Sequence, residues 1–189
     1  MWKKYIWYNR ALILLNLRFI KEDRLKKVLV LGCSGSGKST FSIKLQKKTK
    51  LPLYHLDNIW WNADRTHISR DEFDASLADV VKRDTWIIDG DYSRTYENRI
   101  KACDTIFFLD YGEKVCMDGI TRRVGQERPD MPWTESELDP ELVELVQNYE
   151  HKNKPKLMEL FSKYPDKNVI TFFNREEAEK WIAEGQPEV

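Results

Sequence analysis

Residues 32–39 constrain this sequence most, because they match the phosphate-binding pattern GxxxxGK[ST] in full. They directly follow the apolar run 28–31 and open the stretch 40–50, whose apolar residues recur at helical spacing. Glycines let backbone N–H groups turn toward phosphate oxygens, and the N-terminus of the following helix adds its positive dipole. The sequence therefore predicts a strand, a phosphate-binding loop and a helix, in that order.

The residue types of this phosphate loop (residues 32–39) predict their roles. Lys38 is expected to reach the β- and γ-phosphates of ATP, and the Ser39 hydroxyl to ligate Mg²⁺. A second metal-binding residue is predicted at Asp89, because this carboxylate ends the apolar run 86–88 and can hold the ion through water. The predicted ATP-binding residues here are Gly32, Ser34, Gly35, Ser36, Gly37, Lys38, Ser39 and Thr40.

From about residue 27 onward, short apolar runs alternate with longer amphipathic stretches. This βαβα order predicts a three-layer α/β fold, with a five-stranded parallel sheet and helices on both faces. The predicted strands are residues 28–31, 53–56, 86–88, 105–109 and 169–173.

Helix starts are predicted at residues that can cap a helix and are followed three positions later by a glutamate. The three pairs are Ser69 with Glu72, Thr134 with Glu137, and Asn174 with Glu177.

The stretch from about residue 125 to 140 interrupts the alternation with three prolines, and helical periodicity resumes at Leu142. A charge-rich helix is expected over residues 134–150. We therefore predict a small helical lid at about residues 125–155, inserted in one domain that spans residues 28–189.

The charge of the chain is divided unevenly. Lysine plus arginine and aspartate plus glutamate each total 31, so the formal net charge is zero. Residues 1–27 carry eight basic and two acidic residues, a net +6, which leaves −6 for the body. The body is therefore not expected to bind nucleic acid, and any such contact is expected through residues 1–27.

Residues 1–27 also carry Trp, Tyr and Leu side chains, and this N-terminal extension is predicted to be helical or partly disordered. The preferred interpretation is a helix packed on the body, or a tail that results from a start codon set too far upstream. The alternative is a membrane-surface helix or a partner-binding arm.

Three cysteines, Cys33, Cys103 and Cys116, have no paired spacing, which predicts neither a disulfide framework nor a four-cysteine zinc site. Reduced thiols in a cytoplasmic protein are expected instead. The N-terminal apolar run 11–15 is far shorter than the ~20 residues of a membrane-spanning helix. Without a small-residue cleavage site after this run, neither a signal peptide nor a transmembrane segment is predicted.

Two classes of nucleotide hydrolase are disfavoured. Asp89 is followed by Gly90, whereas motor and transporter ATPases usually place a glutamate there to activate water. A translational-type GTPase is disfavoured because the guanine-reading motif Asn-Lys-x-Asp is missing: residues 153–156 read Asn-Lys-Pro-Lys.

Several further segments resemble a known family. They are residues 86–93 (Trp-Ile-Ile-Asp-Gly-Asp-Tyr-Ser), Leu56-Asp57 with Trp60, Arg99, and the pair Arg122–Arg123. With the phosphate loop, they resemble small P-loop kinases of the adenylate kinase-like superfamily, specifically topology modulation (FlaR-type) proteins, over about residues 27–182. The resemblance implies a P-loop NTPase-type fold with strand order 2-3-1-4-5 and a site for ATP.

The resemblance also implies roles for four arginines. Arg122 and Arg123 stand where this superfamily packs one arginine against adenine and aims another at the phosphates, so Arg122 is assigned to nucleotide binding and Arg123 to catalysis. One of this pair is expected to be an ordinary helix-end cation. Arg94 and Arg99 follow the metal-binding strand and are expected to clamp the acceptor or the transferring phosphoryl group. The alternative for both is a solvated surface position.

Asp57 lies at the end of the second predicted strand. Small-metabolite kinases place a carboxylate here that orients or deprotonates an acceptor hydroxyl, and the alternative is that Asp57 caps the next turn. True adenylate kinases place an arginine in this segment, but residues 57–61 contain none. Trp60 and Trp61 can form an acceptor-side stacking platform, with a core role for at least one of them as the alternative.

The sequence thus predicts an ATP-dependent kinase that transfers the γ-phosphoryl group to a small-molecule acceptor, either a nucleotide or a hydroxyl metabolite. One alternative is a nucleotide-binding regulatory protein with little turnover that acts on DNA topology. A second alternative is a nucleoside monophosphate kinase. The predicted catalytic residues are Lys38, Asp57, Arg94, Arg99 and Arg123.

Overall fold

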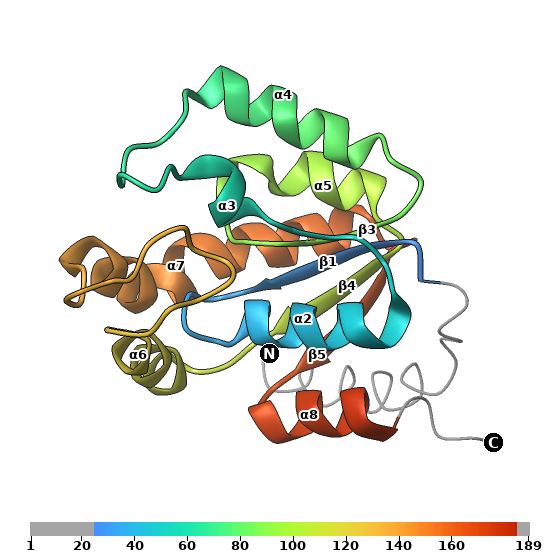
Figure 1. The fold of residues 1–189 in the computed structure, drawn as a ribbon. Coiled ribbons are helices and arrows are strands. Elements are labelled where there is room, and N and C mark those ends of the chain that lie inside the picture. Colours follow the sequence, from blue (N-terminus) through green and yellow to red (C-terminus); the bar gives the residue numbers. More distant parts are fainter. Residues whose placement is uncertain (1–24, 185–189) are drawn as a thin grey trace.

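The computed structural model describes residues 25–184, which form a parallel sheet between two layers of helices (Figure 1). The strands are β1 (Lys27–Gly32), β2 (Leu53–His55), β3 (Trp86–Asp89), β4 (Thr105–Leu109) and β5 (Asn168–Phe172). Their order is β2-β3-β1-β4-β5 and every pairing is parallel. The predicted fold class and strand order are therefore confirmed, whereas the predictions for the N-terminal extension fall almost wholly outside the described residues.

Helices cover both faces of the sheet. Figure 1 shows α2 and α8 on one face, and α4, α5 and α7 on the opposite face. No helix within residues 25–184 is both long and apolar enough to cross a membrane. The α-helices are α2 (Lys38–Thr49), α3 (Leu56–Trp60), α4 (Arg70–Val81), α5 (Tyr96–Ala102), α6 (Glu113–Arg122), α7 (Pro140–Lys163) and α8 (Arg175–Glu184).

The three central strands are buried on both faces. Residues 28–31 of β1, 86–88 of β3 and 106–109 of β4 are at most 1% exposed, as expected of apolar strands inside a parallel sheet. Beneath α2 and α8, the rings of Phe107 and Trp181 pack with centroids 4.6 Å apart. The three cysteines are buried and free, so no disulfide joins them.

Two of the three predicted helix starts are confirmed. Ser69 caps α4 through a complete capping box with Glu72. At the start of α8, the Asn174 side chain accepts a hydrogen bond from the Glu177 N–H, and the Glu177 carboxylate accepts one from the Phe173 N–H.

The predicted helix start at Thr134 is wrong, and the helix expected over residues 134–150 is instead α7, which begins at Pro140. Asp139 caps α7 by accepting a hydrogen bond from the Glu141 N–H. Proline suits the first helical turn, where its missing N–H would have no partner. Glu135, which follows Thr134, pairs with Arg123 of the α6 C-terminus. Residues 123–139 therefore form an irregular connection between α6 and α7, here called the 123–139 loop.

The carboxyl ends of the strands lie on one side of the parallel sheet. β1 leads into the phosphate loop, β3 ends at Asp89, and β2 leads directly into α3, which carries Asp57. Ligand sites in open parallel sheets form at this edge, so the fold brings these predicted site residues together.

Candidate functional site

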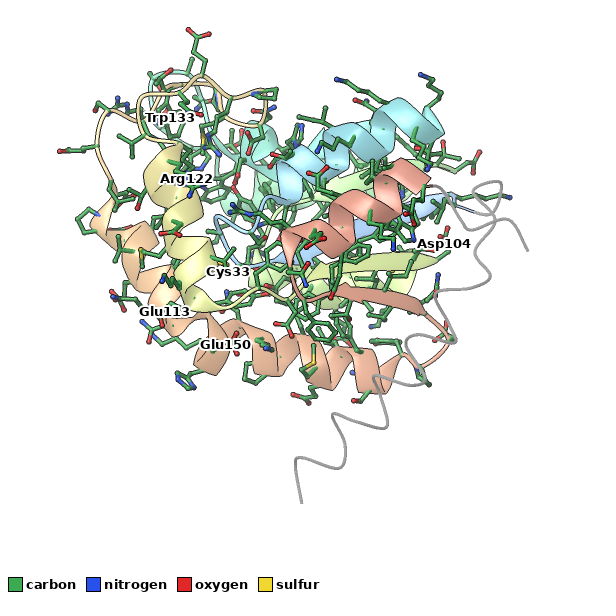
Figure 2. All side chains as sticks on the ribbon, turned by 90° about the horizontal axis from the view of Figure 1, so that it is seen from below. Cys33, Asp104, Glu113, Arg122, Trp133 and Glu150 are labelled. Atoms are coloured by element: carbon green, nitrogen blue, oxygen red, sulfur yellow. The ribbon has the colours of Figure 1, made fainter. Side chains whose placement is uncertain are left out.

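A cleft of about 1080 Å³ lies between the phosphate loop, α3, the loop after β3 and the 123–139 loop. Figure 2 shows the cleft residues Arg122 and Trp133 at the same end of the molecule. The predicted site residues that line the cleft are Ser34, Gly35, Ser36, Gly37, Lys38, Ser39, Thr40, Asp57, Asp89, Arg122 and Arg123. Gly32, Arg94 and Arg99 do not line it.

The phosphate loop is held against α6 by two glycines. Gly35 has a φ of +80°, and a Cβ there would lie 2.0 Å from the carbonyl oxygen of Cys116. A Cβ at Gly119 of α6 would lie 2.0 Å from the carbonyl oxygen of Gly35. Only glycine allows the two backbones to approach this closely. Lys38 bends back over the loop, with its Nζ donating a hydrogen bond to the Cys33 carbonyl at 3.0 Å.

Asp89 offers one carboxylate oxygen without a partner. Its side chain is buried at 2% exposure, and its Oδ1 lies 2.8 Å from Nδ1 of His55. Its Oδ2 is buried and has no hydrogen-bond partner within residues 25–184. Burial opposes protonation of His55, but the hydrogen bond and charge of Asp89 outweigh it and raise the pKa of the imidazole above its usual value.

The residues present fit a magnesium ion. Carboxylate and hydroxyl oxygens are the donors that Mg²⁺ prefers, and Asp89 and Ser39 supply both to the same cleft. No three His, Cys, Asp or Glu side chains between residues 25 and 184 form a metal site by themselves. Mg²⁺ usually keeps several waters and takes phosphate oxygens from the substrate, so two protein donors are sufficient.

Asp57 lies within α3 and is held by Tyr92 from the loop after β3. The Tyr92 hydroxyl donates a hydrogen bond to Asp57 Oδ1 at 2.8 Å. Burial raises the pKa of Asp57, the charges of Asp89 and Asp130 raise it further, and the hydrogen bond from Tyr92 and the charge of Lys38 lower it. The carboxyl group thus faces the cleft with one oxygen fixed.

The structure does not bring Arg94 and Arg99 to the cleft. Arg94 forms a bidentate ion pair with Asp74 of α4, with both N–O distances at 2.7 Å. Arg99 is fully buried, and its guanidinium donates hydrogen bonds to the carbonyls of Gly90 and Asp91 at 3.0 and 2.6 Å. In this structure Arg99 therefore stabilises the loop after β3. Arg94 connects α4 to the short 3-10 helix Ser93–Thr95 that follows that loop.

Arg122 and Arg123 both line the cleft at the end of α6. Arg122 is exposed. Arg123 is half-buried and pairs with Glu135 of the 123–139 loop at 2.8 Å. Burial lowers the pKa of Arg123, and the charge of Glu135 partly offsets this lowering.

The 123–139 loop also brings charged residues into the cleft that were not predicted as site residues, among them Arg128, Asp130 and Glu135. Asp130 is buried, and its Oδ2 accepts a hydrogen bond from the Ser39 hydroxyl at 2.7 Å. Arg128 pairs with Asp130 at 3.2 Å and with Glu135 at 3.4 Å. The alternation of acidic and basic residues around Pro129 was the only available signal, and it does not identify the partner of each charge.

Trp60, Trp61 and Trp133 form an aromatic wall of the cleft. The rings of Trp61 and Trp133 meet edge to face, with centroids 5.1 Å apart. Trp60 stacks on His67 at 4.4 Å and packs against buried Phe73 at 5.4 Å. Trp60 therefore combines a core contact with a cleft-facing position, and Trp61 pairs with a ring from the 123–139 loop.

Solved structures that are similar to this chain include two shikimate kinases. A shikimate kinase from Acinetobacter baumannii in complex with shikimate has a TM-score of 0.56 and 13% sequence identity, covering 87% of this chain and 97% of its own. A shikimate kinase from Bacteroides thetaiotaomicron has a TM-score of 0.54 and 16% identity, covering 86% and 97%. The chain has the P-loop kinase fold. No protein-family model matches it, and no curated protein matches its sequence.

Within this P-loop kinase fold, one cleft combines a phosphate loop, oxygen donors for a cation and a fixed carboxyl group. The charge of Lys38 acts on Asp57, so the two side chains share one electrostatic environment. The aromatic wall provides apolar surface beside that carboxyl group. This arrangement can hold a polyanion, a metal ion and a small polar molecule side by side.

Proposed function

We propose that the protein is an ATP-dependent kinase that transfers the γ-phosphoryl group to a hydroxyl of a small-molecule acceptor. The observation that carries the proposal is the position of Asp57, fixed by Tyr92 in the same cleft as Lys38 and Ser39. A carboxylate beside a phosphate loop suits the activation of a hydroxyl group.

The phosphate loop and Lys38 would bind the triphosphate, with Thr40 and Arg122 as further nucleotide contacts. Ser39 and Asp89 would hold Mg²⁺, which supplies positive charge to the phosphate oxygens when it is bound. Arg123 would face the phosphates from the end of α6. Its pairing with Glu135 connects this role to the position of the 123–139 loop.

On the acceptor side, Asp57 would accept the proton of the attacking hydroxyl. The acceptor oxygen forms a bond to the γ-phosphorus, the bond from that phosphorus to the β,γ-bridging oxygen breaks, and ADP leaves. A pKa raised by burial suits this role, because a carboxylate with a higher pKa is a stronger base. Trp60, Trp61 and Trp133 would form the apolar face of the acceptor site.

The proposal extends to the lid. The 123–139 loop and the first part of α7 would cover the cleft as the lid expected at about residues 125–155. Contacts from Trp133, Arg128 and Asp130 to the cleft support this role. The resemblance to topology modulation (FlaR-type) proteins points to the same class of small kinase, and the proposed reaction does not depend on it.

The test is ADP release from ATP and Mg²⁺ with a panel of acceptors: polyols, sugars, hydroxy acids including shikimate, and nucleoside monophosphates. We expect one class of hydroxyl compound to stimulate ADP release, and Lys38→Ala to reduce that release by at least about 100-fold. Lys47→Ala, an exposed lysine of the same helix, is the matched control and should keep wild-type activity.

The panel also separates the alternatives. A regulatory nucleotide-binding protein would bind ATP but release no ADP with any acceptor. A nucleoside monophosphate kinase would respond to a nucleoside monophosphate. Arg94 and Arg99, the arginines expected to clamp the acceptor, do not line the cleft, and residues 57–61 contain no arginine, so the cleft favours this alternative less.

A further inference from the structure

We infer that Asp130 is a positioning residue for the metal ion: it orients the Ser39 hydroxyl toward the ion and thereby couples the 123–139 loop to metal binding. This inference rests on the proposed ATP and Mg²⁺ site, and it assigns to that site a carboxylate from outside the phosphate loop and β3.

The hydrogen bond between Ser39 and Asp130 leaves the serine oxygen ready for a cation. A hydroxyl group has one proton and two lone pairs. Ser39 donates its proton to Asp130 Oδ2 at 2.7 Å, so the lone pairs of Ser39 Oγ are not used by this contact. Partners that accept or donate behind a metal ligand in this way fix its orientation and increase metal affinity.

Asp130 is itself held firmly. Its side chain is only 5% exposed, and the oxygen that accepts from Ser39 also accepts a hydrogen bond from Arg128 at 3.2 Å. Arg128 pairs with Glu135, which pairs with Arg123 at the end of α6. The carboxylate is therefore fixed by a chain of ion pairs that runs along the 123–139 loop.

A second contact joins this part of the loop to the acceptor side. Asn58 of α3 donates a hydrogen bond to the carbonyl of Pro129 at 2.8 Å. Pro129 directly precedes Asp130, so the backbone is held from α3 while the side chain is held from the phosphate loop. A cation that binds Ser39 would therefore stabilise the loop position seen here.

The other proposed metal-binding residue, Asp89, takes no part in the hydrogen bond between Ser39 and Asp130. Asp89 lies in β3, and its buried Oδ2 has no partner within residues 25–184. The negative charges of Asp89 and Asp130 both act on Asp57, and the charge of Lys38 opposes them. A divalent cation would reduce that repulsion and would thereby stabilise the buried Asp130 carboxylate beside the metal site.

Coupling of this kind is reciprocal. If the loop position seen here strengthens metal binding, metal binding must favour that loop position by the same factor. Through Asp130, binding of the metal–nucleotide complex would then stabilise the loop position. Removal of the Asp130 carboxylate would weaken both the metal affinity and this stabilisation of the loop.

The direct test is the affinity for Mn²⁺, measured by electron paramagnetic resonance of the free ion at saturating non-hydrolysable ATP analogue. We expect Asp130→Ala to weaken Mn²⁺ binding roughly 10–100-fold, and Asp130→Asn, which keeps an oxygen acceptor for Ser39, to weaken it less. Glu127→Ala removes an exposed acid from the same loop and should leave the affinity unchanged. Binding of the analogue without metal, measured in EDTA, should be equal in all four proteins.

A double-mutant cycle with Ser39→Ala tests the route of the effect. If Asp130 acts through Ser39, Asp130→Ala should cost less than about 3-fold in the Ser39→Ala background. Hydrogen exchange of residues 123–139 should slow when Mn²⁺ joins the nucleotide complex of the wild type, and should respond less in Asp130→Ala. Thermal unfolding of each variant verifies that it is folded.

Unchanged or tighter Mn²⁺ binding in Asp130→Ala would overturn the inference, because a carboxylate that merely blocked the site would give tighter binding when removed. A full loss on adding Asp130→Ala to Ser39→Ala would also overturn it. If the wild type bound no nucleotide in EDTA or with metal, the proposed function would itself be wrong, and this inference with it.

Discussion

The two ends of the cleft are built by different means. At the nucleotide end, one continuous segment of backbone forms the phosphate loop, and Gly35 is packed against α6. At the proposed acceptor end, side chains come from α3, from the loop after β3 and from the 123–139 loop. They are held by the Tyr92–Asp57 hydrogen bond, by ion pairs and by aromatic edge-to-face contacts.

The acceptor end can vary in sequence more easily than the phosphate loop. A backbone cradle binds phosphate whatever the other substrate is, and a Cβ at Gly35 or Gly119 would disrupt it. An end assembled from side chains can change its ligand through a few substitutions, while the cradle stays as it is. Substitutions at the acceptor end should therefore affect transfer and leave ATP binding intact.

Asp57→Asn should have the largest effect and tests whether the acceptor end acts separately from the nucleotide end. We expect kcat for acceptor phosphorylation to fall about 10²–10⁴-fold, because the proton acceptor is lost. The ATP dissociation constant should stay within about 2-fold, since Asn can still accept the Tyr92 hydrogen bond. Asp71→Asn, an exposed acid of α4, is the control for steady-state kinetics and calorimetry.

Arg99→Met tests whether the acceptor end depends on buried support. Burial lowers the pKa of Arg99 to about 10, which leaves the guanidinium charged at neutral pH and bonded to backbone carbonyls. Removing these bonds should cost about 3 kcal/mol in the free energy of unfolding, seen as a melting temperature lower by roughly 6–12 °C. A melting temperature within about 2 °C of the wild type would show that Arg99 does not stabilise the loop after β3.

Arg94→Ala should have the smallest effect and sharpens the boundary of the acceptor end. The ion pair with Asp74 is about half exposed, with side-chain exposures of 48% and 45%, so its contribution to stability should be below about 1 kcal/mol. We expect unchanged kcat and KM for the acceptor. A rise in acceptor KM of about 10-fold or more, with the melting temperature unchanged, would instead show that Arg94 reaches the substrate.

Features that depend on neighbouring residues were predictable from the sequence. The phosphate loop, the apolar strands and the Ser69 capping box each lie within a short segment, so spacing alone identifies them. The Thr134 prediction failed because its capping pattern competed with Asp139 and Pro140, five and six residues later, which form a better helix start.

Features that depend on distant partners were not predictable. Ser39 and Asp130 are 91 positions apart, and Asp57 and Tyr92 are 35 positions apart. Arg99 fits the pattern of a substrate clamp in the sequence, but the loop after β3 folds around it and takes its hydrogen bonds through backbone carbonyls, which carry no sequence signal. The contact between His55 and Asp89 also joins residues that are 34 positions apart.

If the protein is the proposed kinase, a phosphoryl group passes from ATP to an organic hydroxyl within this one cleft. The most direct measurement incubates the protein with Mg²⁺ and ATP labelled in its γ-phosphoryl group, together with the acceptor that stimulates ADP release, and follows the label by chromatography. We predict labelled acceptor with the wild type, and none with Lys38→Ala or Asp57→Asn. Label recovered from the wild type only as inorganic phosphate, or only as unchanged ATP, would contradict the claim.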